Sequence, residues 1–305
     1  MCLKKIQISP KTSMLLLVSI QEFLDKAGQG EIELPDHLIQ EFKDSCETAI
    51  RKQFSRRDDV SLRMSGIGRP VCQQILMMQK YSKESSYNDI MRFLFGDLIE
   101  AVAMLVIKAA GIDVVAEQKS CSLVLDKENI KGTLDVIIDE NGTKKVWDIK
   151  SASPYSFDHK FGNGYDKIKE DDAFGYIVQG HLYGEANNLP FGGWIVINKS
   201  TGEWAVVDAP EDDGSERKRV LQQAEDIIRV VKRADFKKAK LKDDWETYKK
   251  DGEIVRTKNR LMPKLCSFCE YKKHCWQDAR LESRVTSKAK SPPQVWYTRY
   301  VQRSI

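Results

Sequence analysis

The stretch that decides the fold runs from Gly132 to Lys150 and reads GTLDVIIDENGTKKVWDIK. Two apolar runs within it are separated by the dipeptide Asn141-Gly142. Asn-Gly between two such runs is the strongest short-range signal for a β-hairpin with a two-residue turn. We therefore predict one strand over about 133–139 and a second over about 144–151.

The turn also determines which side chains face one another. With a two-residue loop, counting back from the turn places Asp135 directly opposite Asp148, and Lys150 shares the face of Asp148. Directly opposed Cβ atoms lie about 5 Å apart, and two carboxylates at that distance repel by roughly 3 kcal/mol at an effective dielectric constant of 20. A divalent cation between them relieves this repulsion, and hard oxygen ligands suit Mg²⁺ or Mn²⁺. Two unrelated surface acids in a hairpin of different register are the alternative, but the apolar neighbours favour a buried pair.

The segments around the hairpin predict a mixed α/β protein. Apolar periodicity and capping residues predict helices before and after the strands. The expected helices cover about 36–54, 71 onward, 85–110, 165–187 and about twenty residues from Ser215, and the expected further strands are 114–125 and a hairpin over 193–207. The fold class is α/β, a mixed central sheet flanked by helices, with helical additions at both ends. We divide the chain into an N-terminal helical region (1–64), a core (65–235) and a basic C-terminal region (236–305).

Composition excludes several classes of protein. The chain has 305 residues, of which 41% are hydrophobic and 31% charged, an ordinary globular profile. No apolar run approaches the roughly 20 residues of a membrane helix, and the run 14–18 predicts a short buried helix or strand rather than a targeting segment. Seven cysteines argue against a disulfide framework and for an intracellular protein. From Arg229 onward, 21 Lys and Arg stand against 9 Asp and Glu, which favours an anionic partner such as nucleic acid.

Four short motifs, taken together, resemble a known nuclease family. They are Asp135, Asp148-Ile149-Lys150, Gly96-x-x-x-Glu100 on the helix before the sheet and Gln179-x-x-x-Tyr183 on the helix after it. Their order is similar to that of the PD-(D/E)XK nucleases, RecB-like branch, in which a helix, three strands and a helix carry the site. Glu100 stands where RecB-like members usually have His, and Asp148 where Glu is commoner. Both residues keep an oxygen ligand.

The resemblance implies a fold, an activity and a role for each motif residue. The fold would be a restriction-endonuclease-like core. The activity would be that of a Mg²⁺- or Mn²⁺-dependent deoxyribonuclease, acting as an exonuclease, with endonuclease activity left open. The implied metal ligands are Glu100, Asp135, Asp148 and the Ile149 carbonyl. Lys150 would be the catalytic lysine, and Gln179 and Tyr183 would support the site or the DNA strand.

A cysteine constellation lies toward the C-terminus. Cys266, Cys269 and Cys275 form the pattern C-x₂-C-x₅-C, and Cys72 or His274 could supply a fourth ligand. Four thiolates suit either zinc or an iron–sulfur cluster. A subset of RecB-like nucleases, including CRISPR-associated RecB-like exonucleases and AddB-type nucleases, binds a 4Fe-4S cluster through one cysteine before the core and three after it in this pattern. The resemblance thus implies a 4Fe-4S cluster on Cys72 and the three later cysteines, with zinc as the alternative.

Basic and aromatic residues outside these motifs are candidate DNA contacts. They are Arg51, Lys52, Arg56, Arg57, the residues His159, Lys160 and Lys167 after the hairpin, and Trp296, Tyr297, Arg299 and Tyr300. For His159, Lys160 and Lys167, a loop without a function is an equal alternative. For the last group, docking of the tail on its own domain is the alternative that we favour. The resemblance implies single-stranded DNA or duplex ends as substrate and a helicase or recombinase as a further partner. It also implies recombination, repair or CRISPR-type processing in a cytoplasm, a host's if the protein is viral. A non-catalytic iron–sulfur or zinc nucleic-acid-binding module and a redox protein are the alternative functions.

Overall fold

The hairpin forms with the predicted register in the computed structural model, which describes residues 12–55, 60–81 and 87–301. Glu140 pairs with Thr143 across the turn. Asn141 and Gly142 have φ of 56° and 91°, the left-handed conformation that a two-residue turn of this type requires. Both strands are longer than predicted, and together they form the centre of a larger sheet.

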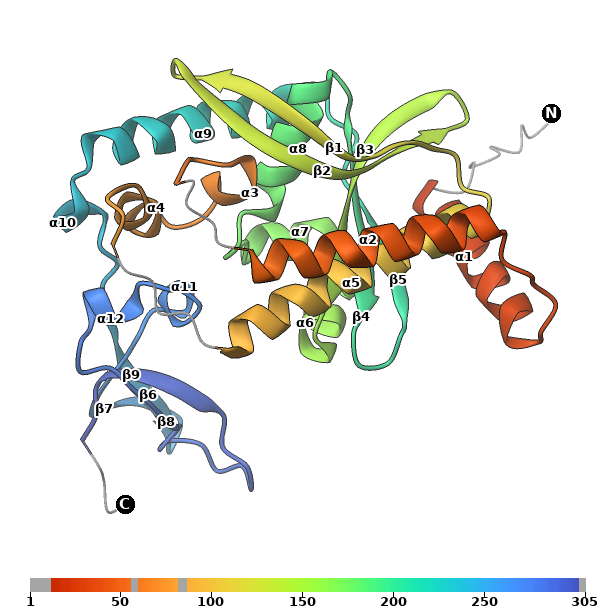
Figure 1. Ribbon diagram of the computed structural model, residues 1–305. Coiled ribbons are helices and arrows are strands. Elements are labelled where there is room, and N and C mark those ends of the chain that lie inside the picture. Colours follow the sequence, from red (N-terminus) through yellow and green to blue (C-terminus); the bar gives the residue numbers. More distant parts are fainter. Residues whose placement is uncertain (1–11, 56–59, 82–86, 302–305) are drawn as a thin grey trace, which may run out of the picture. The chain divides into compact units, whose positions relative to one another are not determined.

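This sheet has five strands in the order β1-β2-β3-β4-β5 (Figure 1). The strands are β1 (Val114–Leu125), β2 (Glu128–Glu140), β3 (Thr143–Ala152), β4 (Phe191–Asn198) and β5 (Trp204–Asp208). Strands β3 and β4 run parallel, whereas the other neighbouring pairs are antiparallel. The mixed α/β class that the sequence predicts is therefore confirmed.

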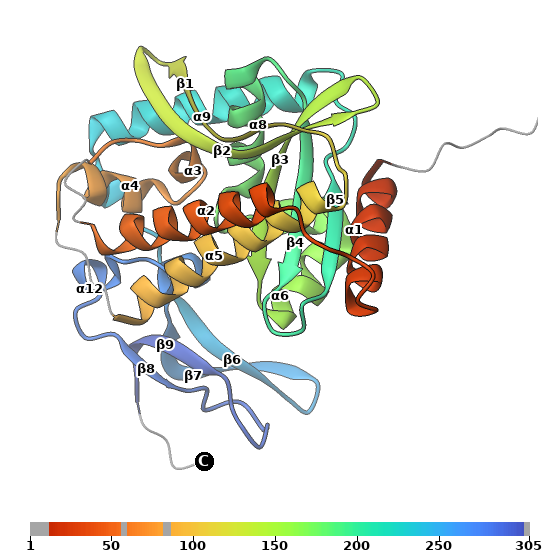
Figure 2. The same cartoon turned by 45° about the vertical axis from the view of Figure 1, so that its right-hand side comes forward.

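Helices cover both faces of the five-stranded sheet (Figures 1 and 2). They include α1 (Thr12–Gly28), α2 (Asp36–Phe54), the one-turn α3 (Met64–Ile67), α5 (Tyr87–Ala109) and α8 (Tyr176–Asn187). Trp147 and Ile149 of β3 belong to the apolar core that α1 and α5 share with the sheet. Since side chains alternate along a strand, Asp148 points to the opposite face, where Gln179 of α8 contacts it. The fold thus places the hairpin acids under α8.

The helix predicted over 165–187 is wrong in one respect, because the structure divides it into α7 (Gly164–Glu170) and α8. Asp172 accepts hydrogen bonds from the backbone N–H groups of Tyr176 at 2.7 Å and Ile177 at 3.0 Å, and so caps α8. Gly175, with φ of 74°, packs so tightly on the backbone of Gly68 that a Cβ there would lie 2.4 Å from the Gly68 Cα. A short helix α6 (Pro154–His159) and a 3₁₀ turn (Phe161–Asn163) connect β3 to α7.

The chain divides into two units that differ from the predicted regions. The first contains residues 1–59, 63–68 and 86–225, so the N-terminal helices belong to the same unit as the sheet. The second contains residues 60–62, 69–85 and 226–305, and α9 (Ser215–Arg233) runs from the first into it.

The prediction of a helical C-terminal addition is wrong, because the second unit is built on an antiparallel sheet of order β6-β7-β9-β8. Its elements are α4 (Val71–Met78), α10 (Phe236–Ala239), β6 (Asp244–Lys250), β7 (Glu253–Leu261), α11 (Lys264–Ser267), α12 (Lys272–Cys275), β8 (Arg280–Ser283) and β9 (Gln294–Arg299). Asp251 and Gly252, with φ of 51° and 86°, form the β6–β7 turn. None of the helices in the described part of the chain is long and apolar enough to cross a membrane.

Candidate active site and cysteine cluster

The paired acids and the lysine of the hairpin meet on one face of the sheet. The observed register, continued by one pair, places Asp135 opposite Asp148. Lys150 Nζ lies 2.6 Å from Asp148 Oδ2, and Gln179 Nε2 donates to Asp148 Oδ1 at 3.0 Å. The backbone N–H of Ile149 donates to Asp135 Oδ2 at 2.8 Å. The Asp148 carboxylate is therefore held by Lys150 and by Gln179 of α8, and the Asp135 carboxylate by the backbone of β3.

Helix α8 presents both of its motif residues to this cluster. Gln179 and Tyr183 lie one turn apart and are 9% and 3% exposed. Burial, followed by the charges of Asp135 and Asp148, raises the pKa of the Tyr183 hydroxyl. Gly132 makes this approach possible, because a Cβ there would lie 2.6 Å from Tyr183 Cε1. Gly132, three residues before Asp135, therefore has a steric role, because it leaves room for the Tyr183 ring.

Glu100 reaches the same group of charges from α5. Gln118 of β1 donates a hydrogen bond to Glu100 Oε1. Burial raises the pKa of Glu100 to about 7; the charges of Lys150 and Lys52 oppose that rise, and the charge of Asp148 adds to it. Lys52, a predicted phosphate contact on α2, thus lies close enough to influence the site.

The charges of the cluster favour an additional cation. Burial and the neighbouring carboxylates raise the pKa of Asp135, and burial raises that of Asp148, which is 1% exposed. Burial alone would lower the pKa of Lys150, but the charges of the two aspartates outweigh it, and that pKa lies above its usual value. Asp148 Oδ2 accepts no hydrogen bond of good geometry although Lys150 Nζ is 2.6 Å away. Three crowded carboxylates with one ammonium group are a donor set that fits a hard divalent ion.

A complete coordination shell is not preformed. Within the residues that the structure describes, no group of three or more His, Cys, Asp or Glu side chains is close enough to hold a metal ion as it stands. This holds for the acids on the sheet and for the cysteines alike. The carboxylates and the thiols are therefore suitable metal ligands, but in each cluster the side chains would have to move closer together around an ion.

Tyr176 belongs to the site and was missed by the sequence analysis. Lys150 Nζ lies 5.3 Å from the centroid of its ring, which is within cation–π distance. Tyr176 precedes Gln179 by three residues and Tyr183 by seven, so all three share one face of α8. This spacing is visible in the sequence, but the prediction of a single long helix concealed that Tyr176 opens α8.

The remaining predicted DNA contacts lie in different surroundings. Arg56 and Arg57 lie outside the described residues. Tyr297 is fully buried, and its hydroxyl donates to Glu246 at 2.8 Å, so this part of the tail packs within the second unit. Docking of the tail on its own domain, the alternative that the sequence favoured, is what the structure shows for this tyrosine.

The four cysteines of the predicted cluster lie together in the second unit. Each of Cys72, Cys266, Cys269 and Cys275 lies close enough to the other three for their ionisations to affect one another. Burial and the neighbouring thiols raise the pKa of Cys266 to about 12, and burial raises that of Cys269 to about 11. The backbone N–H of Tyr271 donates to Cys269 Sγ at 3.4 Å, a bond that stabilises a thiolate. Buried, mutually close thiols of this kind fit a positively charged metal centre.

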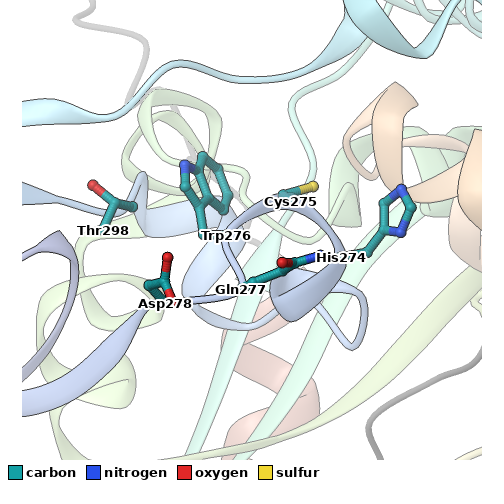
Figure 3. Close-up of a pocket in the computed structure, with 6 residues that line it drawn as sticks. All are labelled: His274, Cys275, Trp276, Gln277, Asp278 and Thr298. Carbon is teal, nitrogen blue, oxygen red and sulfur yellow. The ribbon is translucent and has the colours of Figure 1, made fainter.

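His274, the competing fourth ligand, is engaged in aromatic packing. Its ring centroid lies 4.3 Å from that of Tyr81 and 5.5 Å from that of Phe236. Figure 3 shows this ring and the Cys275 thiol on the wall of one pocket, carried by successive residues of α12. The packing of His274 favours Cys72 as the fourth ligand.

Comparisons with known proteins add little to this geometry. No protein-family model matches the chain, and no curated protein matches it. A solved structure entitled "Crystal structure of SSO0001" is similar with a TM-score of 0.38 and 15% sequence identity, over 62% of this chain and 84% of that one. A similarity of this size supports no conclusion about function.

Proposed function

We propose that this protein is a metal-dependent DNA nuclease of the PD-(D/E)XK type, RecB-like branch, that hydrolyses phosphodiester bonds as an exonuclease. The observation that carries the proposal is that Asp135, Asp148 and Lys150 meet beside Glu100, with Asp148 buried and the other three half-buried. Unrelated surface acids would be solvated, whereas Asp148 is 1% exposed and lies 2.6 Å from a lysine ammonium. Burying like charges together is costly, and proteins tolerate that cost mainly at functional sites.

Glu100, Asp135, Asp148 and the Ile149 carbonyl are the groups that would hold Mg²⁺ or Mn²⁺. When bound, such an ion supplies charge neutralisation at the scissile phosphate and an acidified water molecule. Lys150 remains charged at neutral pH because the aspartates hold its pKa above the usual value. Its ammonium can donate to a phosphate oxygen or orient the attacking water. Gln179 keeps Asp148 in place through its amide, 3.0 Å away.

We further infer a 4Fe-4S cluster on Cys72, Cys266, Cys269 and Cys275, with zinc as the alternative. The support is the grouping of four buried thiols and the engagement of His274 elsewhere. The cluster would serve as a structural cross-link. It would connect α4 to the segment around α11 and α12, across nearly two hundred residues of chain.

DNA, as single strands or duplex ends, is the substrate class that this site favours. The excess of basic residues from Arg229 onward, 21 Lys and Arg against 9 Asp and Glu, supports a polyanionic partner. A helicase or recombinase partner is a proposal that comes from the family resemblance alone. An intracellular location is a proposal that also draws on the cysteine content.

The proposal is tested by cleavage of end-labelled DNA with Mn²⁺ or Mg²⁺. Lys150→Ala and Asp148→Asn should each lower the cleavage rate by about a thousandfold or more while binding in EDTA stays within about threefold of the parent protein. Lys144→Ala is the matched control, because this exposed lysine lies on the same strand but opposite Asp139, four residues or more from Asp135 and Asp148. A parent protein that binds DNA but cuts none with either ion would instead support a non-catalytic binding module.

A further inference from the structure

The segment that follows β3 brings a second lysine close to the proposed catalytic one. Lys160 Nζ lies 5.0 Å from the centroid of the Tyr176 ring, and Lys150 Nζ lies 5.3 Å from the same centroid. The two ammonium groups are thus at most about 10 Å apart, the sum of these distances. Lys160 Nζ also donates to the backbone carbonyl of Asp171 at 2.7 Å, which fixes its position. One nucleic-acid strand can therefore contact both lysines.

An exposed pair of stacked rings lies directly before Lys160. Tyr155 and His159, one turn apart on α6, have ring centroids 4.4 Å apart and an interplanar angle of 12°. Tyr155 is 72% exposed, so most of its surface is available to a flat, apolar partner. The His159 Nδ1 atom lies 3.1 Å from the Tyr155 carbonyl oxygen, which fixes the second ring.

We propose that Tyr155, His159 and Lys160, which we call the α6 wall, form the binding subsite for the nucleotide next to the scissile phosphate. Lys160 binds the phosphate of that nucleotide, and the Tyr155–His159 stack binds its base. This inference rests on the proposed nuclease function and names the form of its substrate. A base can stack on an exposed ring only when it has left its own helix, so the α6 wall selects single strands or frayed ends over paired duplex.

The chemistry of these groups fits this ligand better than a role in folding. An aromatic side chain that is 72% exposed buries little area and contributes little to stability. Aromatic stacking combined with a neighbouring cation is the usual way in which proteins hold single strands without reading their sequence. The α6 wall begins five residues after Lys150, and its Lys160 contacts the same Tyr176 ring as Lys150 does.

The test is binding of a fluorescent single strand in EDTA, where no cleavage occurs. Tyr155→Ala should weaken binding roughly tenfold, because stacking of one base on an aromatic ring contributes about 1–3 kcal/mol, and about 1.4 kcal/mol is tenfold. Tyr155→Phe should restore it, and binding of a blunt duplex should change little. Ile254→Ala is the matched control, since Ile254 is also 72% exposed but lies in the second unit. Lys160→Gln should reduce the slope of log Kd against log salt by about 0.7.

A strand with one abasic nucleotide, moved one position at a time, tests the stacking itself. At one position the parent protein should lose about tenfold in affinity, and Tyr155→Ala should lose nothing further. Unchanged binding by Tyr155→Ala, or losses that add at every abasic position, would overturn the subsite. If the parent protein still cleaves DNA in that case, the nuclease proposal stands alone. If the parent protein neither binds nor cleaves DNA, both proposals fail together.

Discussion

Replacing Asp135 by asparagine should make the metal-free protein more stable and remove its response to divalent cations. Asparagine has nearly the same volume as aspartate and keeps an oxygen for the Ile149 N–H, which is 2.8 Å from Asp135 Oδ2. The substitution removes only a negative charge that lies beside the carboxylates of Glu100 and Asp148. If Asp135 served a structural role, Asp135→Asn would instead lower the free energy of unfolding, since most substitutions of buried polar groups destabilise a protein.

The magnitude follows from the register and from the charges. Facing Cβ atoms lie about 5 Å apart, and two full negative charges at that separation repel by about 3 kcal/mol at a dielectric constant of 20. Lys150 offsets part of this repulsion, because its ammonium is 2.6 Å from Asp148 Oδ2. We therefore expect Asp135→Asn to increase the free energy of unfolding by about 1–2 kcal/mol at pH 7 without metal.

The dependence of stability on pH provides a second, independent test of this prediction. Burial, followed by the neighbouring carboxylates, raises the pKa of Asp135 in the folded state, so the folded protein binds more protons than the unfolded one. Stability of the parent protein should then fall as the pH rises above about 4, the usual pKa of an unfolded aspartate. The advantage of Asp135→Asn should grow over the same range and be absent below it.

Urea unfolding at several pH values, in EDTA and with excess Mn²⁺, measures both effects. At a Mn²⁺ concentration of 100 times Kd, the parent protein should gain about 2.7 kcal/mol and Asp135→Asn much less. Asp113→Asn, an exposed aspartate before β1, is the control with the same change in net charge. A variant that is less stable than the parent in EDTA, or a parent protein indifferent to Mn²⁺, would refute the reasoning.

Three further predictions concern other parts of the chain. Gly132→Ala should lower the free energy of unfolding by about 1–3 kcal/mol and reduce DNA cleavage, because a Cβ would lie 2.6 Å from Tyr183 Cε1. Urea unfolding and a cleavage assay of the purified variant measure these two effects. Cys72→Ser should abolish the broad visible absorbance of anaerobically purified protein, whereas Cys46→Ser should keep it; a colourless, zinc-loaded parent would contradict the cluster. Hydrogen bonding to Arg219 lowers the pKa of Glu216 to about 2, so Glu216→Gln should lower the free energy of unfolding by about 1 kcal/mol at pH 7. This loss should shrink as the pH falls from about 4.5 to 2. Urea unfolding measures it, and an unchanged loss at about pH 3 would count against the prediction.

The hairpin and its register could be predicted because the turn signal is local. Asn141-Gly142 allows one tight turn, and that turn fixes every pairing up to the acids. The break between α7 and α8 could not be found in this way. The Asp172 cap is a local signal, but the break also brings Gly175 against Gly68, more than a hundred residues earlier in the chain. With the break, the sequence analysis also missed the helical face that brings Tyr176 to Lys150.

The C-terminal sheet was missed for a different reason. Its turn at Asp251-Gly252 carries a hairpin signal of the same type as the central one, but the flanking strands are strongly charged and lack a long apolar run. The buried Glu246 stabilises this sheet through hydrogen bonds from Thr257 and Asn259, contacts that depend on the finished fold. For the cysteines, spacing alone left the fourth ligand open between Cys72 and a histidine.

Diffraction from crystals soaked in Mn²⁺, recorded at an energy where manganese scatters anomalously, tests the central claim most directly. The account predicts an anomalous peak in contact with the carboxylates of Asp135 and Asp148, with Glu100 turned toward it, and its loss in Asp135→Asn. Crystals that show Mn²⁺ bound only at other places, with Asp148 still paired to Lys150 and Asp135 still bonded to the Ile149 N–H, would contradict it.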